Sequence, residues 1–289
     1  MNFWTQGLER RGKAMKKQNV FIKHKMFTLY LILAVGIILV AVFAPLIATH
    51  DPGEAVLTEA LKAPGNGHLF GTDKLGRDLF SRVIYGTRSS LPATFALVGI
   101  IFLVGSILGI IAGYFGGWID AVIMRIADMM VAFPGMVLAI AVAGILGPSI
   151  TNAVIAVGLV SWTKYARMAR SLVLKMKHDD YIEAARVTGS RTGYILTRYM
   201  LPTVLPTLII TASTDIGGMM LELAGLSFLG FGATPPTPEW GLMLSEGRAY
   251  MQNAPWVMIF PGLAILIVVT VFNLLGDSLR DVLDPREDE

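Results

Sequence analysis

Long runs of apolar residues, separated by short polar stretches, occupy most of the chain. Met26 to Thr49 holds 24 residues without a formal charge. Such a run makes a helix of about 36 Å, enough to cross a hydrocarbon core of about 30 Å. Met129 to Thr163 is uncharged over 35 residues, too many for one crossing, and Gly147 and Pro148 divide it. The pattern predicts an all-α, polytopic membrane protein with about six transmembrane helices, at about 26–49, 89–116, 121–146, 151–172, 202–230 and 256–278.

These helices are expected to form one transmembrane domain, residues 26–283, between an N-terminal segment at 1–25 and a tail at 284–289. A polar loop at 173–201 separates the fourth helix from the fifth. We expect Pro134 to kink the third helix. Small residues recur at intervals of four in the second helix, a spacing that lets two helices approach closely in lipid; they are Gly105, Gly109 and Gly113.

Composition supports a membrane protein and narrows its chemistry. The chain is 54% hydrophobic and only 16% charged, too apolar for an ordinary soluble domain. It contains no cysteine, which excludes disulfides, thiolate metal sites and thiol catalysis. The four histidines, His24, His50, His68 and His178, show no metal-ligand spacing. We therefore expect solvated loop histidines, no metal site and no catalytic residue.

Basic residues cluster at the ends of apolar runs. Residues 1–25 carry seven Lys and Arg and one acid, and residues 164–198 carry eight bases and three acids. The positive-inside rule therefore predicts that both stretches lie in the cytoplasm, and that residues 50–88 lie outside. The tail at 284–289 is expected inside. Membrane orientation explains the net charge of +3 better than nucleic-acid binding does.

A polar stretch from Asp179 to Pro202 is the longest interruption of the apolar pattern in the second half. Its first part favours a short helix that ends at Gly189. Two adjacent alanines, Ala184 and Ala185, would make one face of this helix shallow, and Glu183 beside them can pair with a basic partner. A short amphipathic helix with no partner is the alternative.

The order of Glu183, Ala184, Ala185, Gly189 and the Leu201–Pro202 pair resembles the EAA loop of ABC importer permeases. Tyr199 is the one departure, since isoleucine is the commonest residue there. The resemblance implies that Glu183, Ala184, Ala185 and Gly189 form a coupling helix. In that family the helix docks into a groove of the ATP-hydrolysing subunit.

Three further stretches resemble the dipeptide, oligopeptide and nickel branch of these permeases. The first is the G-T-D-x-x-G-R-D signature at residues 71–78, in which we expect Asp73 and Asp78 to pin a turn around Arg77 rather than act in catalysis. The others are A-G-L-S-F-L-G-F-G-A-T-P-P-T-P-E-W-G at residues 224–241 and D-S-L-R-D-V-L-D-P-R at residues 277–286.

The resemblance implies a plasma-membrane transport subunit that performs no covalent chemistry, in a bacterium or archaeon. Its implied partners are a second homologous permease subunit, two ATP-binding cassette subunits and an extracytoplasmic binding protein. ATP and Mg²⁺ are expected on the partner subunits. Gly7, Gly12 and Lys13 mimic a phosphate-binding loop, but Ala14 replaces the hydroxyl residue that would hold magnesium.

One stripe of the fifth predicted helix carries polar side chains. Thr211, Asp215, Met219 and Glu222 recur at steps of four, four and three. Because a carboxylate inside the membrane costs about 2.5–3.5 kcal/mol, both acids are expected to face a water-filled path or a partner. We interpret the stripe as a translocation path, with helix packing as the alternative. Neither acid has an obvious basic partner in the neighbouring spans.

Two other function classes use the same acids. A membrane enzyme would use Asp215 and Glu222 as an acid–base pair, but no nucleophile or cofactor motif accompanies them. An ion-coupled secondary transporter would use them as proton or cation sites. For an ABC importer, acids in the path favour a cationic substrate, and the sequence leaves short peptides and nickel or metal chelates both open.

Overall fold

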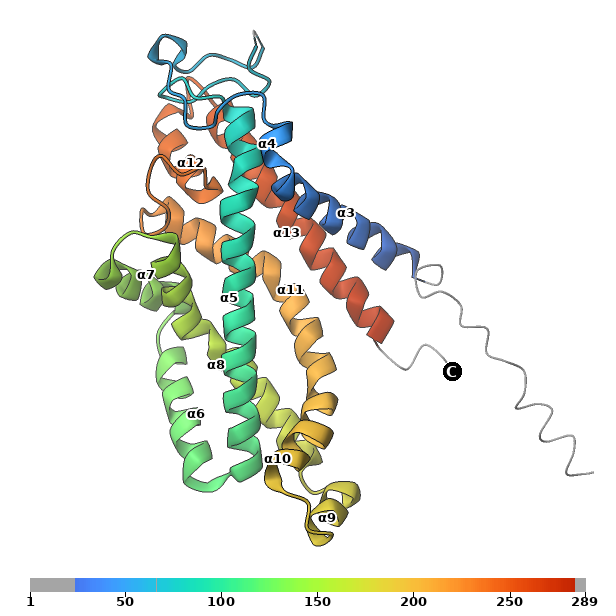
Figure 1. The fold of residues 1–289 in the computed structure, drawn as a ribbon. Coiled ribbons are helices and arrows are strands. Elements are labelled where there is room, and N and C mark those ends of the chain that lie inside the picture. The colour runs from blue at the N-terminus through green and yellow to red at the C-terminus, as the bar shows by residue number, and fades with distance from the viewer. Residues whose placement is uncertain (1–23, 66, 284–289) are drawn as a thin grey trace, which may run out of the picture.

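A computed structural model describes residues 24–65 and 67–283, and in these residues it is helical, with turns and loops and no β-strand. The N-terminal charges at residues 1–23, including the mimic of the phosphate-binding loop, and the tail at 284–289 lie outside the described residues. Figure 1 shows α5 running along most of the molecule, with irregular loops at one end and α9 at the other. We call these the loop end and the α9 end.

The described part of the chain begins with α3 (Lys25–Val42) and α4 (Ala44–Ile47), followed by a long loop with a short 3₁₀ turn at Leu57–Glu59. The remaining elements, in order, are α5 (Leu79–Phe115), α6 (Gly117–Val131), α7 (Gly135–Leu146), α8 (Ile150–Met176), α9 (Asp180–Val187), α10 (Thr192–Ile195), a π-helical turn (Leu196–Met200), α11 (Leu201–Phe228), α12 (Trp240–Gly247), a 3₁₀ turn (Arg248–Tyr250) and α13 (Trp256–Leu283).

Four helical segments of the described chain are long and apolar enough to cross a membrane: Lys25–Val42, Leu79–Phe115, Thr192–Phe228 and Trp256–Leu283. The pair α6 and α7 adds a fifth crossing if it counts as one broken span. The helix predicted at 151–172 is observed as α8, but the basic residues in its second half keep it out of this group of four. The expected all-α fold is confirmed, and the number six is approximate.

Two predicted helices differ from the observed ones. The second begins at Leu79 rather than residue 89, because Asp78 caps it: its side chain accepts a 2.8 Å hydrogen bond from the Ser81 amide. The third is broken rather than kinked, since α6 and α7 meet at 91° across the segment that contains Pro134. The missing N–H of proline, at the N-cap of α7, ends the continuous helix there.

Glycines of α5 lie against α8, as the spacing of small residues predicted. A Cβ added at Gly105 would lie 2.5 Å from the Trp162 carbonyl oxygen, and one at Gly113 would lie 2.9 Å from the Val173 side chain. The two backbones therefore approach more closely than any larger residue would permit. The buried apolar side chains form two clusters. One involves α5, α7, α8, α9, α10 and α11, and the other involves α3, α5, α11, α12 and α13.

Buried charges hold the loop end together. Arg77 Nε lies 2.6 Å from Asp73 Oδ2, as the signature predicted, and Arg77 Nη2 lies 3.1 Å from Glu246 Oε2 on α12. Asp78 takes no part in this pair and instead caps α5. Glu239 accepts hydrogen bonds from the amides of Gly241 and Leu242 and so begins α12. Both family-like motifs thus have structural roles at this end.

Candidate coupling helix and translocation path

The short helix α9 forms where the sequence predicted one. Asp180 and Glu183 lie in its first turn and Arg186 in its last, an arrangement that complements the helix dipole. Gly189 follows with φ of +80°, a left-handed conformation that glycine adopts without steric cost. The helix therefore has defined ends on both sides.

The two faces of α9 have different environments. Ile182 and Ala185 are buried in the same apolar cluster as residues of α8 and α11. Glu183, Ala184 and Gly189 are exposed. Because adjacent helix positions differ by about 100°, only Ala184 of the alanine pair is available to a partner. The expectation that both alanines form the outer face is wrong for Ala185.

Two exposed apolar side chains of α9 extend this outer face. Val187 is 88% exposed and Tyr181 is 45% exposed. Sequence reasoning missed Val187, although its position three residues after Ala184 was a usable signal. Partial burial and the nearby Asp179 carboxylate raise the pKa of Tyr181, so its hydroxyl stays protonated and neutral. The outer face is therefore small and mainly uncharged, with Glu183 at its side.

Contacts on the inner side tie α9 to several elements. Arg186 lies over the Tyr114 ring near the end of α5, with 5.4 Å between the guanidinium carbon and the ring centroid. Tyr199, the departure from the family pattern, lies in the π-helical turn, and its ring centroid is 5.8 Å from that of Tyr194 and 6.1 Å from that of Tyr181. An aromatic residue at position 199 therefore fits this local packing.

Three bases on α8, spaced by three residues, pair with acids on two other helices. Arg167 Nη2 lies 2.9 Å from Asp128 Oδ1 on α6. One turn further on, Arg170 makes a two-pronged contact with Asp120 of α6, with Nη2 2.6 Å from Oδ2. The third base, Lys164, points to α11. These pairs connect α8 to α6 and α11.

Asp215 is the partner of Lys164. Lys164 Nζ lies 2.6 Å from Asp215 Oδ1, and the Tyr165 hydroxyl donates a 2.9 Å hydrogen bond to Oδ2. The expectation that Asp215 lacks a basic partner is therefore wrong. Both of its oxygens are engaged, and its side chain is only 13% exposed. In this conformation Asp215 joins α8 to α11, as the packing alternative predicted.

The rest of the stripe follows the same side of α11. The Thr211 hydroxyl lies 3.3 Å from Met168 Sδ on α8, and it contributes to a 430 Å³ pocket that Asp277 and Arg280 of α13 also line. Met219 packs against the apolar cluster that contains α8. Glu222 is half-buried and makes no hydrogen bond or ion pair within the described part of the chain. Of the two acids of the stripe, Asp215 is paired and Glu222 is unpaired within the described residues.

The histidines do not all behave as expected. His50 and His178 are exposed, but His68 is buried, with 8% of its surface accessible. The expectation of a solvated loop residue is wrong for His68, because carboxylates on either side of its ring satisfy both ring nitrogens.

Two family models match the chain: the binding-protein-dependent transport system inner membrane component over residues 105–289, and the N-terminal TM domain of oligopeptide transport permease C over residues 19–64. The chain is 45% identical to a dipeptide transport system permease protein of Alkalihalophilus pseudofirmus, over 91% of this chain and 87% of the relative. It is 43% identical to a nickel transport system permease protein of Escherichia coli, over 82% of this chain and 86% of the relative. An inward-facing structure of the MetNI methionine ABC transporter shares the fold, with a TM-score of 0.58 and 19% identity over 70% of this chain and 97% of that one.

Proposed function

The chain belongs to the binding-protein-dependent inner membrane component family and is a permease subunit of an ABC importer, and from this premise we propose that its substrate is a short peptide with a free ammonium group. It is a transport component rather than an enzyme.

Glu222 carries the substrate proposal. It is a half-buried carboxylate on a transmembrane helix, and its cost is offset when a cation approaches it. A peptide ammonium group supplies that cation, while Met219 on the same stripe offers an adaptable apolar contact. Nickel prefers imidazole and other nitrogen donors, and α5, α8, α11 and α13 carry no histidine. These features favour the peptide of the two substrate classes that the sequence left open.

The coupling proposal rests on the inner face of α9. Ile182 and Ala185 share one apolar cluster with α8 and α11, so a force on the outer face displaces helices rather than a free loop. A partner ATPase that contacts Ala184, Glu183 and Val187 would move α8 and α11 together as its nucleotide domains close. The exposed small face of α9 supports this docking, with Gly189 as the end of the coupling helix.

Orientation follows from the same assignment. The α9 end is proposed to face the cytoplasm, where ATP is available, and the loop end to face outward, where a binding protein delivers substrate. A second homologous permease subunit and two ATPase subunits would complete the complex. ATP and Mg²⁺ are proposed to bind to those ATPase subunits and no cofactor to bind directly to this chain for transport.

Uptake measurements in cells that express the whole transporter test the substrate. Labelled dipeptide should accumulate, and Glu222→Gln should reduce the accumulation about tenfold or more. A close pair of unit charges is worth roughly 4 kcal/mol at an effective dielectric of about 20, and about 1.4 kcal/mol corresponds to tenfold. Asp281→Asn is the control, since it removes the same charge from an exposed side chain near the end of α13.

Nickel uptake in the same cells separates the two substrate classes. If nickel or its chelate accumulates and dipeptide does not, the peptide assignment is wrong while the permease role stands. If Glu222→Gln carries peptide at the normal rate and the complex remains assembled, Glu222 is not part of the path.

A further inference from the structure

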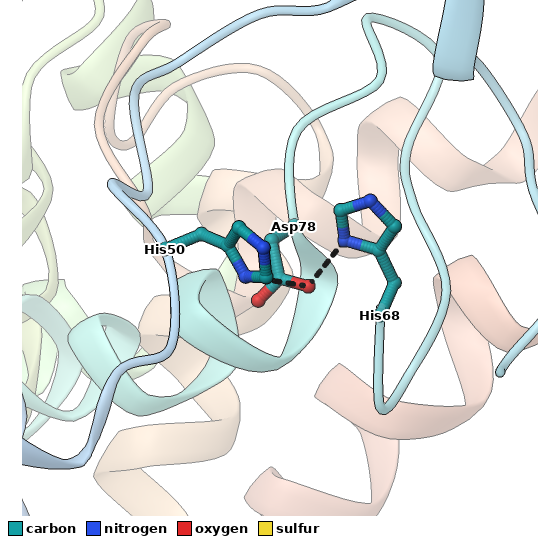
Figure 2. A group of neighbouring side chains, drawn as sticks. All are labelled: His50, His68 and Asp78. Atoms are coloured by element: carbon teal, nitrogen blue, oxygen red, sulfur yellow. Dashed lines mark hydrogen bonds and ion pairs between the residues drawn. The ribbon is translucent and has the colours of Figure 1, made fainter. Parts of the chain in front are cut away.

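Three metal-ligating side chains meet at the loop end, outside the stripe on α11. His50 follows α4, His68 lies in the loop before α5, and Asp78 caps the first turn of α5. One ligand atom from each of them lies within 4.8 Å of the others. Figure 2 shows both imidazole rings beside the Asp78 carboxylate. The chain segments involved are separated along the sequence and brought together only by the fold.

We propose that His50, His68 and Asp78 bind a divalent transition metal of the zinc class. His68 Nδ1 lies 2.8 Å and His50 Nδ1 lies 3.7 Å from the same oxygen, Asp78 Oδ1. Zinc takes nitrogen and oxygen ligands at about 2.0–2.2 Å in tetrahedral geometry, which places neighbouring ligand atoms about 3.4 Å apart. Small side-chain movements therefore suffice to place the three ligands around one ion, with a water molecule in the fourth position.

The two oxygens of Asp78 have separate roles. Oδ2 accepts the 2.8 Å hydrogen bond from the Ser81 amide that caps α5, and Oδ1 faces both histidines. The backbone amide of His50 donates a 3.0 Å hydrogen bond to the Ser81 hydroxyl. The cap thus fixes the carboxylate and holds the backbone of His50 next to it. The metal would replace the contact between His50 Nδ1 and the Thr49 hydroxyl, which are 3.0 Å apart.

Glu59 orients His68 from the other side. His68 Nε2 donates a hydrogen bond of 2.8 Å to Glu59 Oε2, while Lys62 Nζ lies 2.7 Å from Glu59 Oε1. A metal-bound histidine almost always donates its second ring N–H to a carboxylate or carbonyl, which fixes the tautomer and the ring plane. This contact directs Nδ1 of His68 toward Asp78 and His50. Glu59 is therefore a positioning residue.

The residues around the three ligands leave a route by which a cation can reach them. A pocket of 140 Å³ reaches the three ligands, and the acids Asp51, Glu54 and Glu59 also line it, so it attracts cations. The side chains of His68 and Asp78 are buried, while that of His50 is 39% exposed, which leaves a route from solvent.

A zinc titration of the full-length chain, purified in detergent together with its transporter partners, tests the proposal. After treatment with a chelator, we expect one saturable zinc per chain, measured by competition with a chromogenic zinc indicator. His50→Gln, His68→Gln and Asp78→Asn should each weaken binding tenfold or more. Asp78→Asn keeps a good N-cap residue, so α5 still begins at the same place. His50→Gln changes an exposed side chain and leaves the buried part of the cluster in place.

Matched variants separate this site from ordinary surface histidines. His178→Gln removes an exposed imidazole at the α9 end and should leave zinc affinity unchanged. Glu59→Ala should weaken binding about 10- to 100-fold, as loss of an outer-shell partner does. Glu59→Gln keeps a hydrogen-bond acceptor for His68 Nε2 and should restore most of that affinity. The loss and rescue distinguish orientation of His68 from a general effect on the fold.

Zinc should also raise the thermal unfolding temperature of the wild-type chain, and the chelator should reverse the rise, because a ligand that binds only the folded state stabilises it. The absence of saturable binding overturns the proposal and leaves His68 as a buried hydrogen-bonding residue. Equal zinc affinity in the wild type, His50→Gln and His68→Gln also overturns it, since that result shows an adventitious ion only.

Discussion

The Lys164 ammonium group lies 2.6 Å from the Asp215 carboxylate and so joins α8 to α11. The pair connects the two helices that flank α9, and Tyr165 adds a second link to the same carboxylate. The sequence alone does not distinguish an acid that contacts substrate in the path from an acid that links two helices. The pair therefore makes the two interpretations of Asp215 separable by experiment.

Lys164→Met should lower the free energy of unfolding of the purified complex by roughly 1 kcal/mol. The expected loss of stability is small because the Lys164 side chain is 53% exposed, and solvent weakens an exposed ion pair. The double variant Lys164→Met with Asp215→Asn should recover part of the loss, because no uncompensated carboxylate then remains. Unfolding is followed by fluorescence in detergent. Reduced uptake with unchanged stability would instead place Asp215 in the path and count against the helix link.

Ala184→Arg should abolish ATP-driven uptake while the chain still inserts into the membrane. A long charged side chain cannot enter a contact surface sized for alanine. Copurification of the ATPase subunits and uptake are the two measurements. Ala63→Arg is the control, because it makes the same substitution at an exposed loop position. Normal uptake by Ala184→Arg would refute docking through this face.

Gly109→Ala should destabilise the chain by about 1–3 kcal/mol, the usual cost of overpacking. A Cβ at this position meets the Ala166 backbone on α8, which a side-chain rotation cannot relieve. Gly99→Ala is the matched control in the same helix, since a Cβ there has no neighbour within 4 Å. Thermal unfolding of both variants gives the comparison. Equal stabilities would contradict the close approach of α5 and α8.

Single cysteines at Leu57 and Val187 should react with a membrane-impermeant thiol reagent from opposite sides of the membrane. These side chains are 70% and 88% exposed, and the chain has no cysteine of its own. The loop-end cysteine should label in intact cells, and the α9-end cysteine only after the membrane is opened. Labelling of both in intact cells would reverse the proposed orientation of α9.

The sequence predicted what depends on local patterns. Charge-free runs located the apolar helices, and the Gly-terminated polar stretch located α9 within one or two residues. The glycine spacing predicted a close helix contact of the second helix, and the structure gives α8 as its partner. Motif resemblance identified the family that the comparisons then established.

Features that depend on the relative position of two elements were not predictable. The start of α5 was not predicted because Arg82 and Arg88 interrupt the apolar pattern. In the structure a helix cap and a buried ion-pair cluster keep this charged segment helical. The pairing of Lys164 with Asp215 requires the register of α8 against α11, which no single-chain periodicity contains. His50 and His68 are 18 residues apart and meet only because α4 and the loop return to the first turn of α5.

The span of α5 has a mechanical consequence. With 37 residues, it measures about 55 Å at 1.5 Å per residue. Asp78 sits at one end, and the Tyr114 contact with Arg186 of α9 is at the other. Pro92 removes one backbone hydrogen bond between these ends. The longer, glycine-lined arm beyond Pro92 is held against α8, whereas the shorter arm before it packs with α12 and α13. The backbone of α5 is therefore weakest where the two arms meet, and a change in the angle between the arms is expected at Pro92.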